Sequence, residues 1–178
     1  MAVSVTPEKF HYVSFDAELI ARIAQDLIDA IGLDRPVTIA VDETTPLARI
    51  SIEMADTLRI SADSGAFEDT RKPRQQSEIA TATALGRVLL RAHDRLEGGF
   101  GEAPGDDALS LAQIAAWEVY CIGRLSRLGI TTNQQRWRYN FRNRHGFRDS
   151  TDQAFDQLWQ STGLTWAEME AICLTAAQ

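Results

Sequence analysis

Residues 77–96 read SEIATATALGRVLLRAHDRL, the longest segment of this chain with a single clear period. On a helix, at about 100° per residue, four of its five charged side chains share one narrow arc, formed by Arg87, Arg91, Asp94 and Arg95, and the fifth, Glu78, lies in the first turn. The rest of the circumference is mostly apolar or small, and it is much wider than the stripe by which a surface helix packs on a core. The segment therefore predicts a helix that is covered on more than one side.

Upstream of this helix, the sequence predicts another helix followed by three strands. Apolar residues at i+4 spacing indicate an amphipathic helix over residues 16–31, with Ser14 or Asp16 as its cap and Gly32 as its stop. Apolar residues then alternate with polar ones in three segments, residues 37–41, 50–54 and 58–61. Short connections favour antiparallel neighbours, so we expect a small antiparallel three-stranded meander with one face packed on the helices.

Downstream of residue 96 the sequence predicts only helices. Residues 97–108 are rich in Gly, Pro and acid and predict a linker. Helix caps are predicted at Ser110, at Ser150 with Gln153, and at Thr165 with Glu168. The predicted fold class is therefore α+β, with an α-β-β-β-α core over residues 1–96 and an all-helical C-terminal part over residues 109–178 that packs on the core as one domain.

Length and composition favour a soluble, cytoplasmic, acidic protein. A chain of 178 residues, 44% of them hydrophobic, can bury a sizeable core. No stretch reaches the ~18 apolar residues of a membrane helix, and residues 1–13 lack the apolar segment of a signal peptide, so we expect no membrane partner. Cys121 and Cys173 are far apart and predict buried, reduced thiols rather than a disulfide framework. The oligomeric state is left open.

Sequence motifs point to no catalytic centre. The three histidines, His11, His93 and His145, never fall at i, i+3 or i+4, which is the spacing that zinc-binding helices use. The sequence has no P-loop, no dinucleotide-binding glycine motif and no nucleophile elbow. Adjacent acids such as Asp42 and Glu43 lie next to predicted loops, where carboxylates are usually solvated. We therefore expect no catalytic residue, no metal ligand and no cofactor. The sequence favours a protein that is not an enzyme.

The strongest candidate for a binding site is RWRYNFRNRHGFR, residues 136–148. It holds five of the 18 basic residues and no acid, which leaves 13 basic and 25 acidic residues, a net charge of −12, in the rest of the chain. Asn133 as a cap and Gly146 as a stop favour a helix, with Trp137 and Phe141 one turn apart on a docking face. The candidate binding residues are Arg136, Trp137, Arg138, Arg142, Arg144, His145 and Arg148.

Three roles fit this segment. Clustered Arg with aromatic residues can bind nucleic-acid phosphates and stack on bases, or it can dock an acidic protein partner. The same side chains can instead pair with carboxylates of their own chain and cover its aromatic rings. We favour the intramolecular role, and we consider nucleic acid the weakest partner because the acidic remainder of the chain repels phosphate.

A second DNA-binding signal is weak. Gly163-Leu164-Thr165 lies between two predicted helices and matches the turn of a helix-turn-helix. However, Trp159 stands where that motif has a small residue, and the helix from Trp166 onward is acidic with no Arg or Lys. We therefore expect an αα-hairpin that covers the hydrophobic core.

The order of elements, one helix, three strands and one long buried helix, resembles the minimal zincin-like (metalloprotease-like) fold over roughly residues 15–96. The resemblance implies that TLRISADSGAFED, residues 57–69, forms the edge strand and loop ahead of the active-site helix. In that family the helix carries His-Glu-x-x-His, in which two His bind zinc and the Glu acts as a base. Here the three positions hold Gly86, Arg87 and Leu90, so the resemblance implies a degenerate core without its metal site. The chain also resembles proteins of actinobacterial type, which implies no function.

The preferred function is a non-enzymatic scaffold or protein-interaction domain with such a degenerate zincin-like core. Its expected partner is an acidic protein. The alternatives are a nucleic-acid-associated protein that uses residues 136–148, which would bind with a steep salt dependence, and an enzyme with an acid-lined cleft.

Overall fold

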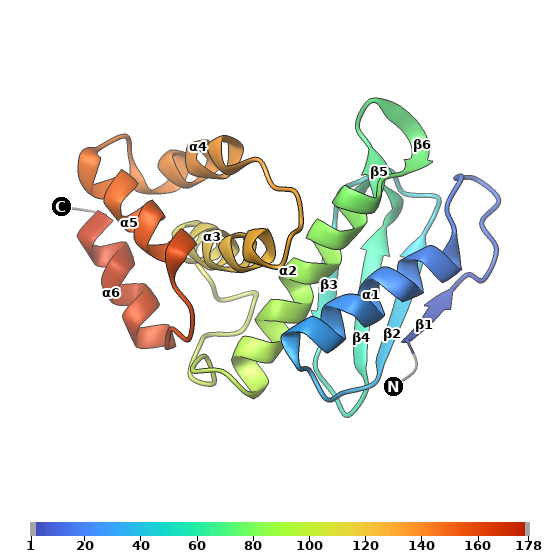
Figure 1. Ribbon diagram of the computed structural model, residues 1–178, viewed down its shortest axis with the longest axis horizontal. Coiled ribbons are helices and arrows are strands. Elements are labelled where there is room, and N and C mark those ends of the chain that lie inside the picture. The colour runs from blue at the N-terminus through green and yellow to red at the C-terminus, as the bar shows by residue number, and fades with distance from the viewer. Residues whose placement is uncertain (1–2, 177–178) are drawn as a thin grey trace. The chain divides into compact units, whose positions relative to one another are not determined.

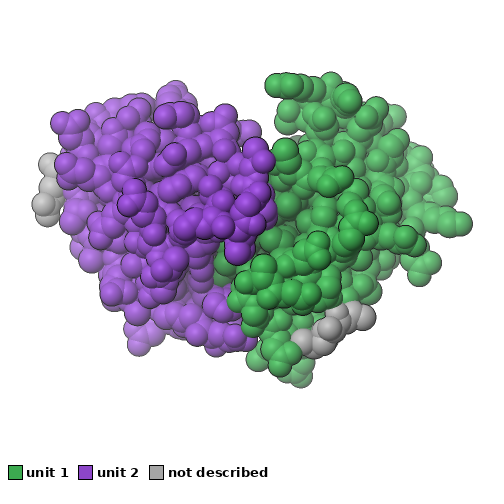
Figure 2. Space-filling view, viewed as in Figure 1, with its two compact units in different colours: residues 1–92 green, residues 93–178 purple. Residues whose placement is uncertain are grey.

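A computed structural model describes residues 3–176, and the chain divides into two compact units (Figures 1 and 2). Unit 1 comprises residues 1–92 and unit 2 comprises residues 93–178, so the division falls inside helix α2 (Glu78–Leu96). The segment predicted as a linker, residues 97–108, belongs to unit 2, where Phe100 is fully buried. The packing of the helical part on the core as one domain stays a prediction.

Unit 1 combines two helices with a mixed sheet and a short hairpin, which confirms the α+β class. Its elements are β1 (Val3–Thr6), α1 (Ala17–Ile31), β2 (Val37–Asp42), β3 (Ile50–Glu53), β4 (Leu58–Asp63), a 3₁₀ turn (Ser64–Ala66), β5 (Glu68–Asp69), β6 (Lys72–Gln76) and most of α2. The predicted cap of α1 is confirmed, since the Asp16 carboxylate accepts hydrogen bonds from the N–H groups of Glu18 and Leu19. Gly32 ends the helix with a φ of 79°, a conformation that favours glycine.

The predicted three-stranded antiparallel meander is wrong. The sheet has four strands in the order β1-β2-β4-β3, in which β1, β2 and β4 are parallel and only β3 is antiparallel to its neighbour β4. The strand implied to be the edge, β4, lies inside the sheet, and β3 takes the edge instead. Strand β1 was not predicted at all.

The burial of the strands agrees with this order. In β4, Leu58, Ile60 and Ala62 are buried, whereas in β3 Ile50 and Ile52 are only half-buried. The strand with a neighbour on each side is therefore the more buried of the two. The connection 43–49 crosses the end of β4, where it passes so close that a Cβ on Gly65 would collide with the carbonyl oxygen of Pro46.

Only one face of the sheet is buried. Along β2 and β4 the buried residues alternate with exposed ones such as Ala40, Arg59 and Ser61, as the period of two predicted. Figure 1 shows α1 and α2 lying over the same face of the sheet. Helix α2 is capped by Ser77, whose hydroxyl accepts a hydrogen bond from the N–H of Ala80, and Leu85 and Leu89 on it are fully buried.

Unit 2 is helical, as predicted. After the last turn of α2 it contains α3 (Leu111–Arg127), α4 (Gln134–His145), α5 (Asp149–Gln160) and α6 (Trp166–Ala176). The capping box at Thr165 and Glu168 is confirmed, but Ser150 is not a cap, because α5 begins one residue earlier without a side-chain cap. Helices α5 and α6 form the expected αα-hairpin around Gly163.

An aromatic cluster forms the core of unit 2. Phe100 stacks on Tyr120 with ring centroids 5.8 Å apart, and it also contacts Trp117 and Trp166. All four rings are buried, so the glycine-rich segment around Phe100 is packed into unit 2. Among residues 3–176, no helix combines the length and the apolar character needed to cross a membrane.

Candidate interaction surface on helix α4

The basic segment 136–148 folds largely into α4, with the predicted ends. The Asn133 side chain accepts a hydrogen bond from the N–H of Arg136, and Gly146 follows the last turn with a φ of 100°. The docking residue of this helix is Phe141, which is fully buried and contacts Phe155 of α5 at a centroid distance of 5.9 Å. Trp137, predicted to dock beside it, is only half-buried.

Two of the candidate arginines pair within unit 2. Arg142 donates to both carboxylate oxygens of Asp152, at 2.8 and 2.6 Å. Arg138 reaches Asp156 at 2.5 Å and Asp152 at 3.5 Å, and its guanidinium lies over the Phe155 ring. The hydrogen bond from Arg142 holds the pKa of Asp152 below its usual range. These two arginines therefore fasten α4 to α5, which is the intramolecular role proposed from the sequence.

His145 also has a structural role. Its ring stacks on Phe141 at a centroid distance of 4.1 Å, and its Nε2 lies 3.0 Å from the carbonyl oxygen of Ala112, to which only an N–H can donate. Burial lowers the pKa of His145, and the hydrogen bond to Ala112 opposes this only in part. Arg148 donates to the carbonyl oxygen of His145 at 3.2 Å, which closes the C-terminal end of the helix.

The opposite face of α4 is exposed, and we call it the outer face. Its residues follow the i+3 and i+4 spacing that places side chains on one side of a helix. They are Arg136, Tyr139, Asn140, Asn143 and Arg144. Within the described residues, the side chains of Arg136 and Arg144 form no ion pair. Beside them, Tyr139 and Phe147 contact each other edge to face, although they are 58% and 63% exposed.

A shallow groove of about 250 Å³ lies between the outer face and α3. Asn140, Asn143 and Arg144 line it from α4, and Leu111, Ile114, Ala115 and Glu118 line it from α3. Leu111 is 59% exposed, so the groove offers both an apolar contact and polar groups. Exposed apolar side chains rimmed by polar ones are typical of protein-binding surfaces.

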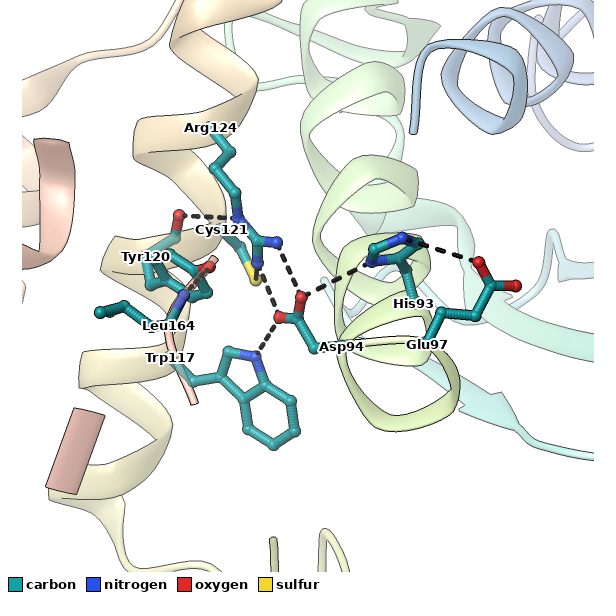
Figure 3. A network of polar contacts seen from close by, with 8 residues as sticks. All are labelled: His93, Asp94, Glu97, Trp117, Tyr120, Cys121, Arg124 and Leu164. Carbon is teal, nitrogen blue, oxygen red and sulfur yellow. Dashed lines mark hydrogen bonds and ion pairs between the residues drawn. The ribbon is translucent and has the colours of Figure 1, made fainter. Parts of the chain in front are cut away.

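Sequence reasoning missed a buried polar network in unit 2 (Figure 3). Asp94 is 3% exposed and accepts hydrogen bonds from Trp117 Nε1 at 2.8 Å and from both Nη atoms of Arg124 at 2.7 Å. The Arg124 guanidinium also lies 3.8 Å from the centre of the Tyr120 ring. Burial raises the pKa of Asp94, but the hydrogen bonds and the charge of Arg124 outweigh it, so the pKa lies below its usual range.

This network serves the core and presents no nucleophile to solvent. Cys121 is buried and forms no disulfide, and its sulfur accepts a hydrogen bond from Arg124 at 3.5 Å. His93 lies 3.9 Å from Asp94, beyond hydrogen-bond distance, and its buried Nδ1 has no hydrogen-bond partner among the described residues. Cys173 also forms no disulfide, and burial raises its pKa to about 11. Its side chain is therefore a protonated thiol near neutral pH and a weak nucleophile.

Comparison with family models, with curated proteins and with solved structures finds no match for this chain. Within residues 3–176, no three or more His, Cys, Asp or Glu side chains cluster in a way that could hold a metal ion.

Proposed function

We propose that this chain is a non-enzymatic protein-interaction domain, that its binding surface is the outer face of α4, and that its partner is an acidic segment of another protein. The observation that carries the proposal is the division of the arginines of α4. Arg138 and Arg142 are used internally, by Asp152 and Asp156, whereas Arg136 and Arg144 project from the exposed face without an ion pair among the described residues.

Charge complementarity supports an acidic partner. Residues 134–148 contain no acid, although the whole chain carries a net charge of −7. An acidic segment would therefore be attracted to this face and repelled by most of the remaining surface, which would fix where it docks. The exposed Tyr139 and Phe147 rings add the aromatic contact area that interface centres commonly use.

Nucleic acid is the second candidate, and the same geometry weakens it. Only part of the basic segment projects outward, and each arginine that pairs internally is lost to phosphate contacts. The negative net charge also opposes the approach of a polyanion along the rest of the surface.

We also propose that the core of unit 1 is a degenerate zincin-like core. Its support is the order of α1, the strands and α2, together with the burial of Gly86 and Leu90, which occupy two of the three motif positions. In this proposal α2 contributes packing where a metalloprotease helix would contribute ligands.

The test is a binding titration with a fluorescein-labelled 15-residue peptide of alternating Glu and Leu, followed by fluorescence anisotropy. We expect the double variant Arg136→Ala/Arg144→Ala to bind about tenfold more weakly, because it loses two solvent-exposed ion pairs, each worth up to about 1 kcal/mol. The matched control, Arg22→Ala/Arg71→Ala, makes the same charge change at two exposed sites in unit 1 and should bind like the wild type.

The same titration with labelled single-stranded DNA separates the two candidates. Tighter binding to the DNA than to the peptide, lost in the Arg136/Arg144 variant, would replace the protein partner with nucleic acid. Equal losses in the variant and its control would show that net charge alone governs binding, and would refute the outer face as the site.

A further inference from the structure

A second cavity, of about 250 Å³, lies in unit 1 and is built around the ends of two parallel strands. Strands β2 and β4 are parallel neighbours, with Asp42 beside Asp63, so the two strands end side by side at their carboxyl ends. The chain after β2 contributes Glu43 and Thr44 to the cavity, and the chain after β4 contributes Ser64 and Glu68. Crevices at the carboxyl ends of parallel strands are recurrent ligand sites in proteins.

Several hydrogen bonds fix the walls of this cavity. The hydroxyl of Thr44 donates to Asp42 at 2.6 Å, and this bond, with those from Thr45 and the Thr44 N–H, lowers the pKa of Asp42 to about 2. Asp42 therefore stays ionised and holds the turn that carries Glu43. One oxygen of Glu43 in turn accepts the N–H groups of His11 and Tyr12, both at 2.7 Å, which ties the N-terminal segment to the rim.

Arg74 lines the same cavity from β6 with an unusual backbone. Its φ of 63° lies in the left-handed region, which residues with a Cβ rarely adopt and which tends to be retained at functional positions. This conformation directs the Arg74 carbonyl to the N–H of Ser14, at 2.7 Å, beside the segment that supplies Tyr12 and Val13. This hydrogen bond therefore links β6 to the N-terminal segment that also lines the cavity.

The charges in the cavity do not cancel. The charged residues among those that line the cavity are two acids, Glu43 and Glu68, and one base, Arg74. Ser64 is 1% exposed, and its hydroxyl lies 3.1 Å from Glu68 and also 3.1 Å from the carbonyl oxygen of Thr45, so its single proton can serve only one of the two. Within the described residues, Glu68 has no cationic partner.

From this lining we propose that the cavity binds a free amino acid with a second ammonium group, whose ammonium ends face Glu68 and Glu43 and whose carboxylate faces Arg74. A net lining charge of −1 matches a ligand of charge +1. At roughly 30 Å³ per water-sized group, the volume suits about eight to ten non-hydrogen atoms, below the size of a nucleotide or a drug. The site lies wholly in unit 1 and is independent of the outer face of α4.

Isothermal titration calorimetry with three probes tests each half of the site. L-lysine carries both ammonium groups and the carboxylate, cadaverine lacks the carboxylate, and glutarate lacks the ammonium groups. We expect L-lysine to bind one per chain, cadaverine to bind about tenfold more weakly, and glutarate not to bind, since each charge-assisted contact is worth about a factor of ten.

Two variants assign the contacts. Glu68→Gln keeps the shape and should weaken both L-lysine and cadaverine. Arg74→Gly suits the left-handed backbone, so it should fold normally, bind cadaverine as before, and bind L-lysine only as weakly as cadaverine. Glu53→Gln, on the edge strand outside the cavity, is the control and should change nothing.

The proposal is overturned if the wild-type protein gives no heat of binding with L-lysine up to about 10 mM. That concentration would still reveal a ligand with a binding free energy of about −3 kcal/mol. It is equally overturned by glutarate binding more tightly than L-lysine, or by L-lysine binding that survives both Glu68→Gln and Arg74→Gly. A failed peptide titration on α4 has no bearing on any of these results.

Discussion

The Arg124 guanidinium meets the Asp94 carboxylate in a two-pronged ion pair, with each Nη atom 2.7 Å from one carboxylate oxygen. The pair joins the last turn of α2 to α3, and Trp117 donates a third hydrogen bond to the same carboxylate. Breaking such a buried pair is costly because the remaining charge keeps its desolvation penalty and loses its partner.

Arg124→Met should therefore lower the free energy of unfolding by about 3–5 kcal/mol, because Asp94 would remain buried without its counter-charge. Urea denaturation at pH 7 measures this change. The control, Arg136→Met on the outer face of α4, should stay within about 0.5 kcal/mol of the wild type. A loss below about 1 kcal/mol for Arg124→Met would mean that water reaches Asp94 in solution.

His145 predicts a pH dependence of stability. Burial depresses its pKa in the folded chain, so between the folded value and the unfolded value of about 6.5 the unfolded chain binds more protons. Stability should then be complete above pH 6.5 and fall as the pH drops through that window. His145→Gln, which keeps a donor for Ala112, should show a smaller loss between pH 7.5 and pH 5.5 in urea denaturation.

The other two histidines provide the internal control for this experiment. His11 and His93 are present in both proteins, so their contributions to the two stability profiles cancel in the comparison. Parallel pH profiles for the wild type and His145→Gln would contradict the burial of the His145 ring.

Gly123 predicts a packing limit between α3 and α5. A Cβ at this position would collide with the backbone carbonyl of Trp159, so the glycine allows the two helices to approach closely. Gly123→Ala should cost about 1–3 kcal/mol, since the backbone of α5 must move away. Gly101→Ala is the matched control, because its Cβ would come no closer than 3.9 Å to the carbonyl oxygen of Arg95. Thermal unfolding distinguishes the two, and equal midpoints would refute the close approach.

Features set by neighbours in the sequence were the ones that sequence reasoning could predict. Asp16, Ser110 and Asn133 cap helices because each side-chain oxygen lies within reach of N–H groups two or three residues along the chain. The ends of α4 were predicted for the same reason. Ser150 is the exception, since in the structure its hydroxyl lies near the carbonyl oxygen of Ala176 and not at the start of α5.

Features set by distant contacts could not be predicted in this way. The position of β4 inside the sheet depends on β1 and β2, and short connections carry no information about β1. Asp94 shares an arc with Arg87 and Arg91 and therefore resembles a surface residue, although Arg124 and Trp117 bury it. A signal was available in retrospect, because a lone acid among arginines on an otherwise apolar helix needs a partner once that helix is covered.

The candidate site shows the same limit. The sequence indicated that residues 136–148 matter, but a helical period alone could not say which arginines face inward. The inward-facing arginines are the ones that pair with Asp152 and Asp156 on the next helix. In the sequence alone, these two acids contribute only to the net charge of the rest of the chain. The cavity in unit 1 was beyond reach for the same reason, since its lining comes from four separate segments.

Replacing Arg138 and Arg142 distinguishes an intramolecular, stabilising role of the α4 arginines from a role in binding a partner. Their joint replacement by Ala should lower the free energy of unfolding by more than about 1 kcal/mol, the upper end for exposed pairs, because Arg138 is largely buried over Phe155 and both arginines share Asp152. Arg136→Ala/Arg144→Ala removes the same two charges from the outer face and should leave the unfolding midpoint unchanged while weakening the acidic peptide. The reverse pattern, in which the inner pair is silent in thermal unfolding and the outer pair destabilises, would mean that α4 is docked through the other face and that the proposed surface is buried.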